Sequence, residues 1–262
     1  MNINNAGNKI WSIGGTSDSV NIAKMLAAND ILFVVSVATL AAQALYSQDT
    51  RVFVGCMNQK QMQSFCRQEN IKAIVDASHP YAVEVSQNAI AISAKLNIPY
   101  LRYERKEYRA SDLPHANSAI IELDSFDALL AGDYLQGHNV LLTIGCKALK
   151  RFESWQTRAI LYARVLPKIE SLKKALDAGF TSERTIAIRP PLDLALERAL
   201  WQQWNISLVV TKASGKAGGE ELKRQLAAEL DIPLIVITRP KIAYPQQTMD
   251  LEEVLNFCRR SP

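Results

Sequence analysis

The sequence has few of the residues that build metal centres or disulfide frameworks. It contains four cysteines and three histidines among 262 residues. The cysteines are far apart, and none forms a C-x-x-C pair: Cys56, Cys66, Cys146 and Cys258. This spacing indicates neither a zinc site nor a disulfide framework, and it predicts a reducing, cytoplasmic compartment. We therefore expect no bound metal.

Long apolar runs are also absent. The longest charge-free stretch, residues 31–48, is interrupted by Ser36, Thr39, Gln43 and Ser47. Such a stretch is more typical of a strand followed by a helix than of a membrane span. The first nine residues are polar and unlike a signal peptide. We expect no membrane partner.

Neither sign of charge dominates. Thirty Lys and Arg residues against 26 Asp and Glu residues give a net charge of +4, without a basic run. This excess is too small to indicate a nucleic-acid partner, but it suits a small anionic ligand. The sequence also contains no H-E-x-x-H or G-x-S-x-G motif and no carboxylate pair at glycosidase-like spacing.

Short β-branched runs alternate with helical segments along the chain. The first expected strands are Lys9–Ile13, Ile31–Val37, Arg51–Gly55, Ala73–Asp76 and Pro99–Arg102. After a polar connection at residues 108–117, the expected strands are Ala119–Leu123, Asn139–Thr143, Ala159–Val165, Thr185–Ile188, Ser207–Val210 and Leu234–Ile237. Residues 249–258 are expected to form a closing helix. The alternation predicts two doubly wound parallel α/β domains, residues 1–110 and 111–262.

In such domains, ligands bind at the carboxyl ends of the strands. The loop after the first strand is Gly14, Gly15, Thr16, Ser17 and Asp18. Its glycines allow a close approach to the backbone, and the helix that follows offers N–H groups to a phosphate. The full G-x-G-x-x-G fingerprint is absent, so a tight turn with a Ser cap is the alternative.

The second strand ends in Ser36-Val37-Ala38-Thr39. NAD-specific domains carry a carboxylate here for the ribose 2′-hydroxyl. The hydroxyls of Ser36 and Thr39 leave room for a 2′-phosphate instead, which favours NADPH over NADH. A helix cap by Thr39 is the alternative.

Two further loops of the first half carry ionisable or aromatic side chains. His79, Pro80 and Tyr81 follow the fourth strand. His79 can donate to a phosphate or a substrate and Tyr81 can stack on a ring, whereas the alternative is a helix start with a buried Tyr. Arg102 and Arg105 end the fifth strand, where they either fork onto substrate carboxylates or form surface salt bridges.

The most basic loop follows the strand near residue 210. Its sequence is Thr211-Lys212-Ala213-Ser214-Gly215-Lys216-Ala217-Gly218-Gly219-Glu220. Two lysines, a serine and three glycines before a strong helix predict an anion-binding loop. The G-x-x-x-x-G-K-[ST] pattern does not match, so the loop does not indicate an NTPase.

In this order, the loops resemble those of the precorrin-6A reductase family of cobalamin biosynthesis, which includes the cobalt-precorrin-6A reductases. The resemblance spans nearly the whole chain. Its most specific parts are the loops at residues 76–82 and 212–215, and it also includes Leu142–Gly145, Ala163–Pro167, Ile232-Pro233 and Arg239-Pro240.

The resemblance implies two Rossmann-like domains with a cleft between them, and an NADPH-dependent reduction of one double bond of a contracted tetrapyrrole. The implied cofactor contacts are Gly14, Gly15, Thr16, Ser17, Asp18, Ser36, Thr39, His79 and Pro80. The implied substrate contacts are Arg102, Arg105, Lys212, Ser214, Gly218 and Gly219. His79 and Tyr81 would border the nicotinamide. The proton would come from His79, Lys212, an ordered water or the substrate itself.

Three positions depart from the family pattern. Val20 and Cys56 stand where the family often has Arg, and residues 189–192 replace a Gly-Pro-Phe stretch. These changes leave open which cations contact the nucleotide, and Arg51 is a candidate for compensation.

The sequence leaves two other function classes open. One is a non-catalytic protein that binds a tetrapyrrole or a nucleotide. The other is an S-adenosylmethionine-dependent methyltransferase, which the absence of an acidic residue at 36–39 disfavours.

Overall fold

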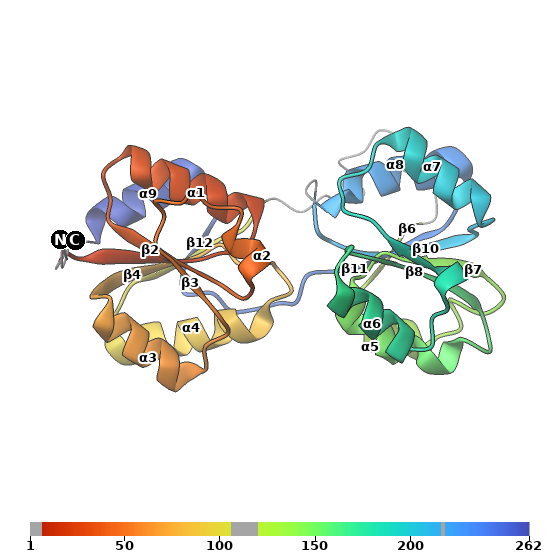
Figure 1. Cartoon of the computed structure of the whole chain (residues 1–262), viewed down its shortest axis with the longest axis horizontal. Coiled ribbons are helices and arrows are strands. Elements are labelled where there is room, and N and C mark those ends of the chain that lie inside the picture. Colours follow the sequence, from red (N-terminus) through yellow and green to blue (C-terminus); the bar gives the residue numbers. More distant parts are fainter. Residues whose placement is uncertain (1–6, 106–119, 216–217, 262) are drawn as a thin grey trace. The chain divides into compact units, whose positions relative to one another are not determined.

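The structure, a computed structural model, describes residues 7–105, 120–215 and 218–261. The chain divides into two compact units. Unit 1 comprises residues 1–106 and 241–262, and unit 2 comprises residues 107–240 (Figure 1). The expected connection at 108–117 lies outside the described residues, as do Lys216 and Ala217 of the basic loop. No described helix is long and apolar enough to cross a bilayer.

Unit 1 is built on a six-stranded parallel sheet in the order β12-β5-β4-β1-β2-β3. Its strands are β1 (Lys9–Ile13), β2 (Phe33–Val37), β3 (Val52–Val54), β4 (Ile71–Asp76), β5 (Tyr100–Tyr103) and β12 (Gln247–Thr248). Its helices are α1 (Ser17–Ala28), α2 (Leu40–Gln43), α3 (Gln59–Gln68), α4 (Val83–Leu96) and α9 (Leu251–Arg260).

Helices cover both faces of this sheet (Figure 1). Successive residues of a strand point to opposite faces, and in β1 both sets are buried. Ile10 packs with Ile22 of α1 and Phe257 of α9, while Trp11 packs with Phe65 of α3 and the α4 side. The strands therefore read as continuous apolar runs, as expected for a parallel sheet buried on both sides.

Unit 2 has a second six-stranded parallel sheet, in the order β6-β11-β10-β7-β8-β9. Its strands are β6 (Ile120–Leu123), β7 (Asn139–Leu142), β8 (Ile160–Val165), β9 (Thr185–Ala187), β10 (Leu208–Lys212) and β11 (Leu234–Ile237). Its helices are α5 (Phe126–Ala131), α6 (Ile169–Asp177), α7 (Leu194–Gln203) and α8 (Glu220–Leu230), with 3₁₀ segments η2 (Cys146–Trp155) and η3 (Ser182–Arg184). The segment between β7 and β8, where the alternation of strands and helices predicts a helix, is thus a 3₁₀ helix.

Both sheets have the 3-2-1-4-5-6 order of doubly wound nucleotide-binding domains, and the fold class expected from the alternation is confirmed. The sixth strands, however, are exchanged. The strand that follows β5 along the chain, β6, joins the sheet of unit 2, and the strand that follows β11, β12, joins the sheet of unit 1.

The exchange corrects the domain boundary expected from the sequence. Residues 241–262 belong to unit 1 and not to a continuous second domain. The backbone N–H of Arg102 donates to the carbonyl of Gln246 at 2.9 Å, and Val254 and Phe257 of α9 are buried in the core that α1 covers. The strand β12 was not expected because it has only two residues, both polar.

The returning helix makes the stability of unit 1 depend on the far end of the chain. Phe257→Ala should lower the free energy of unfolding of unit 1 by about 3–5 kcal/mol, because it opens a cavity beside α1. Hydrogen exchange of β1 and β5 peptides in rising urea would measure the loss. The control Met249→Ala, at a side chain 63% exposed, should change it by less than about 0.5 kcal/mol. A loss confined to unit 2 would contradict the exchange of strands.

Candidate functional site

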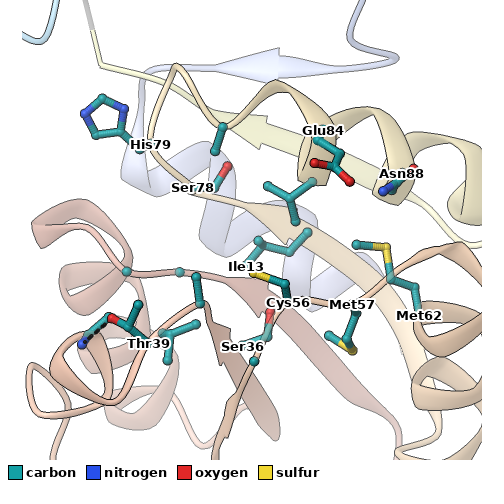
Figure 2. A pocket seen from close by; sticks show the side chains of 18 residues that line it. Ile13, Ser36, Thr39, Cys56, Met57, Met62, Ser78, His79, Glu84 and Asn88 are labelled. Carbon is teal, nitrogen blue, oxygen red and sulfur yellow. Dashed lines mark hydrogen bonds between the residues drawn. The ribbon is translucent and has the colours of Figure 1, made fainter. Parts of the chain in front are cut away.

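A pocket of about 310 Å³ lies at the carboxyl ends of β1, β2, β3 and β4 in unit 1 (Figure 2). It is at the point where the chain leaves β1 and β4 in opposite directions, as expected for a ligand site in this type of sheet. Of the residues expected to bind a cofactor, those that line it are Gly14, Gly15, Ser36, Thr39 and His79.

The glycine loop is closely packed. A Cβ atom on Gly14 would lie 2.3 Å from the Tyr46 hydroxyl, and Gly15 has a φ of +102°, which side chains disfavour. The Tyr46 hydroxyl accepts a hydrogen bond from the Gly15 N–H at 3.0 Å and lies 2.7 Å from the Ser19 hydroxyl. Tyr46 was not singled out from the sequence, and it fixes the shape of this loop.

Thr16 holds two loops together rather than lining the pocket. Its hydroxyl accepts from the Ser19 N–H at 3.1 Å, which caps α1, and donates to the Ala77 carbonyl at 2.8 Å. The loops after β1 and β4 are thereby joined. Asp18 forms an ion pair with Arg105 at 3.0 Å, so the Arg105 guanidinium is engaged by a carboxylate of unit 1.

The hydroxyls expected to face a ribose also serve the fold. Ser36 accepts from the indole N–H of Trp11 at 2.8 Å, and Thr39 caps α2 by accepting from the Ala42 N–H at 3.3 Å. Both residues still line the pocket. Arg51 does not compensate for the missing family arginines, because it precedes β3 at the opposite edge of the sheet and pairs with Glu69.

His79 is the exposed member of the loop after β4. Its Nδ1 accepts from the Tyr81 N–H at 3.3 Å, and the centroids of the His79 and Tyr81 rings are 5.7 Å apart. Pro80 is buried and Tyr81 is half-buried, and neither lines the pocket. Only His79 of this group therefore faces the site directly.

The far end of the pocket was not expected from the sequence. It is apolar and sulfur-rich, formed by Cys56 and Met57 of the segment after β3 and by Met62 of α3, and it also includes Glu84 and Asn88 of α4 (Figure 2). Val85 of α4 lines the pocket as well. A four-residue spacing puts Glu84 and Asn88 on one helix face, which is the signal that was available. Among the described residues that line the pocket, none is Lys or Arg.

Arg102 is not available to a substrate, which corrects the expectation for this residue. Its side chain is 1% exposed. Its Nη1 donates to Asp76 Oδ1 at 2.9 Å and to the Ser78 hydroxyl at 3.2 Å, and its Nε donates to Glu104 at 3.2 Å. Burial and the Asp76 charge raise the pKa of Tyr100, so its phenol stays protonated and donates to Asp76 Oδ2 at 2.7 Å.

Two buried side chains of α8 form hydrogen bonds with the backbone of the basic loop of unit 2. The carboxylate of Glu220 accepts from the Gly215 N–H at 2.8 Å. The ammonium of Lys223 donates to the carbonyls of Gly218 and Gly219 at 2.8 and 3.0 Å. Both side chains are 1% exposed. The carbonyls of the Gly218-Gly219 turn are thus drawn toward the protein interior.

Lys212 ends β10 beside the start of the loop. Burial and the nearby Lys147 lower its pKa, and its Nζ lies 5.5 Å from the centroid of the Phe126 ring. Strands β10 and β7 are neighbours from which the chain proceeds in opposite directions. Lys212 therefore stands at the switch point of the second sheet, and Ser214 and the two glycines follow it in the same loop.

Burial makes Lys223 a source of pH dependence. It faces Arg164 of β8, Glu197 of α7 and Glu220 of its own helix, and burial lowers its pKa from 10.5 to about 7. Between these values the unfolded chain binds more protons than the folded chain, so stability rises with pH there. Below pH 7 the cost of burying the ammonium is fully present.

The wild type should therefore gain stability relative to Lys223→Met by up to about 1.4 kcal/mol per pH unit from pH 7 upward. Urea unfolding at pH 6, 7, 8 and 9 measures the difference. The hydrogen bonds that the variant loses add an offset that does not change the slope. Parallel curves for the two proteins would contradict the shifted titration.

Comparisons with known proteins agree over nearly the whole length. Residues 9–259 match the family described as Precorrin-6x reductase CbiJ/CobK. The chain is 41% identical over 256 residues to a cobalt-precorrin-6A reductase of Synechocystis sp., with 96% of each chain covered. It is 34% identical over 252 residues to one of Priestia megaterium, covering 94% of this chain and 96% of that one.

More distant relatives extend the same pattern. A precorrin-6A reductase of Rhodococcus erythropolis is 28% identical over 249 residues, with 92% and 93% of the two chains covered. The solved structure named CobK precorrin-6A reductase has the same fold, with a TM-score of 0.79, 22% identity and 97% of each chain covered. The chain belongs to the precorrin-6x reductase family.

Proposed function

We propose that the protein reduces one double bond of the precorrin-6A macrocycle, in its cobalt-containing or metal-free form, to the 6B form in cobalamin biosynthesis, with NADPH as reductant. The observation that carries the proposal is the alignment with reductases across 96% of the chain. The two relatives described above that are most similar bear the cobalt name, so the cobalt form is the proposed natural substrate.

The pocket of unit 1 suits a dinucleotide. Gly14 and Gly15 line it at the end of β1 beside the first turn of α1, whose N–H groups can donate to a pyrophosphate. The apolar end formed by Met57, Met62 and Val85 suits a purine ring. A reduced nicotinamide supplies the hydride when bound. His79 stands at the polar end, where it can orient the nicotinamide or its substrate partner.

The preference for NADPH rests on the ribose end of the pocket. No carboxylate follows β2, where one would repel a 2′-phosphate. A neighbouring pocket of about 340 Å³ shares Cys56 and Met57 with the first, and Lys60 is among the residues that line it. We assign Lys60 as the cation that forms an ion pair with the 2′-phosphate.

Unit 2 is proposed to bind the polycarboxylate substrate. Lys212 and Ser214 offer donors to a carboxylate, and Lys223 holds the Gly218-Gly219 turn in place. The lowered pKa of Lys212 also makes its ammonium a better acid. It is therefore our proposed source of the proton that accompanies the hydride. Arg102 and Arg105 are not part of the proposed substrate site, because each forms an ion pair with a carboxylate of unit 1.

A cytoplasmic location remains part of the proposal. All four cysteines are free thiols, and Cys56 is exposed, which suits a reducing compartment.

An anaerobic turnover assay tests the reaction. With NADPH and cobalt-precorrin-6A, the nicotinamide absorbance and the macrocycle spectrum should change together, and metal-free precorrin-6A should react more slowly. Binding of both ligands without turnover would favour the non-catalytic alternative. A thermal shift with S-adenosylmethionine and none with NADPH would favour a methyltransferase. Either result would overturn the proposal.

The cofactor preference has a separate test. Lys60→Met should raise the Kd for NADPH about tenfold, as expected for the loss of one ionic contact worth about 1.4 kcal/mol, and leave the Kd for NADH within twofold. Isothermal titration of both nucleotides measures this. Lys72→Met, at an exposed lysine of β4 that does not line either pocket, is the matched control. Equal changes for the two nucleotides would refute the role of Lys60.

A further inference from the structure

The segment from Leu166 through α6 exposes several large apolar side chains. Ile169 is 89% exposed, Leu176 57%, Leu166 39% and Leu172 36%. On the helix, Ile169, Leu172 and Leu176 are spaced three and four apart and share one face. The opposite face of the helix packs against the domain, because Ser171 and Ala175 are buried. We call Leu166, Ile169 and Leu172 the α6 patch.

The α6 patch lies at the ligand-binding edge of the sheet of unit 2. Leu166 directly follows β8, and Ile169 is the first residue of α6. The carboxyl ends of parallel strands in one sheet meet at the same edge. The patch is therefore at the edge where β10 delivers Lys212 and where β7 leads into η2.

Lysines surround the patch. Lys147 is in the first turn of η2, which follows β7 at this edge of the sheet. Its charge adds to burial in lowering the pKa of Lys212, and to the Lys174 hydrogen bond in lowering that of Glu170. Lys168 is the N-cap of α6. Lys174 forms a hydrogen-bonded pair with Glu170. Glu170 offsets one of these cations, and the cluster keeps a clear positive excess.

We propose that the α6 patch binds the flat face of the tetrapyrrole substrate, with Lys147, Lys168 and Lys212 paired to the carboxylates at its rim. The inference rests on the proposed function. The loop after β10 offers donors for carboxylates but no apolar surface for the ring, and the α6 patch supplies that surface. A contracted tetrapyrrole has an apolar ring and carboxylate side chains around it. An apolar patch with a cationic border complements both features.

The charge also argues against a second copy of this chain as the occupant. A symmetric dimer places the same surface on both sides of the interface. Two lysine-bordered patches would then face each other, and like charges opposed across an interface disfavour association. A small polyanion with an apolar centre avoids this repulsion, because its charges are opposite to those of the lysines.

Ile169→Ser tests the proposal, because the side chain is 89% exposed and its replacement leaves the core intact. The KM for the macrocycle should rise at least tenfold, while kcat stays within twofold and the Kd for NADPH is unchanged. Ile169→Leu should retain the wild-type KM. The matched control is Leu196→Ser, at a 40% exposed leucine of α7, which should leave all three constants unchanged.

The lysine border has its own readout. The KM of the wild type should rise with ionic strength, and Lys168→Gln should reduce that dependence, since one ionic contact is lost. An unchanged KM in Ile169→Ser would overturn the proposal. So would a lower sedimentation coefficient for this variant than for the wild type, because it would show that the patch binds another protein chain. Macrocycle binding is also followed by absorbance without NADPH. If wild-type turnover fails, this titration still tests the α6 patch separately from the proposed reaction.

Discussion

The buried carboxylate of Asp76 is the interaction on which unit 1 depends. It ends β4 with 0% exposure, which is tolerated because four donors surround it. Oδ1 accepts from the Ser78 N–H and from Arg102, and Oδ2 accepts from the hydroxyls of Ser86 and Tyr100. One side chain thereby fixes the loop after β4, the start of α4 and the strand β5. Because that loop and α4 form one wall of the nucleotide pocket, the shape of the pocket follows from this network.

The same network reaches the segment that returns from unit 2. The Tyr244 ring lies 5.4 Å from the Arg102 guanidinium and stacks on Tyr100 with a centroid distance of 6.5 Å. Beyond it, β12 pairs with β5 and α9 covers α1. The buried Asp76–Arg102 ion pair is therefore covered in part by the segment of residues 241–262. In unit 2, the buried Lys223 and Glu220 likewise support the loop that follows β10.

The sequence was sufficient for features that follow from local pattern. Alternating apolar runs predicted the strands, and parallel strands bring their carboxyl ends together, so Gly14, Ser36 and His79 were expected at one site and line one pocket. Pairings between distant residues leave no such pattern. Arg102 looked available because its partner, Asp76, is 26 residues away, and nothing in the local pattern indicated that Lys223 of α8 is buried.

The exchanged sixth strands also affect the order in which the two sheets are completed during synthesis. During synthesis β5 emerges first, but its partner β12 follows only after all of unit 2. The nascent unit 1 therefore carries an unpaired sheet edge and lacks the cover of α9. The strand β6 emerges early as well, and it waits for β11. Open edges of this kind invite incorrect pairing. Unit 2 is continuous along the chain and has all its strands once β11 has emerged, whereas unit 1 still lacks β12 and α9. Unit 1 is therefore synthesised first but completed second.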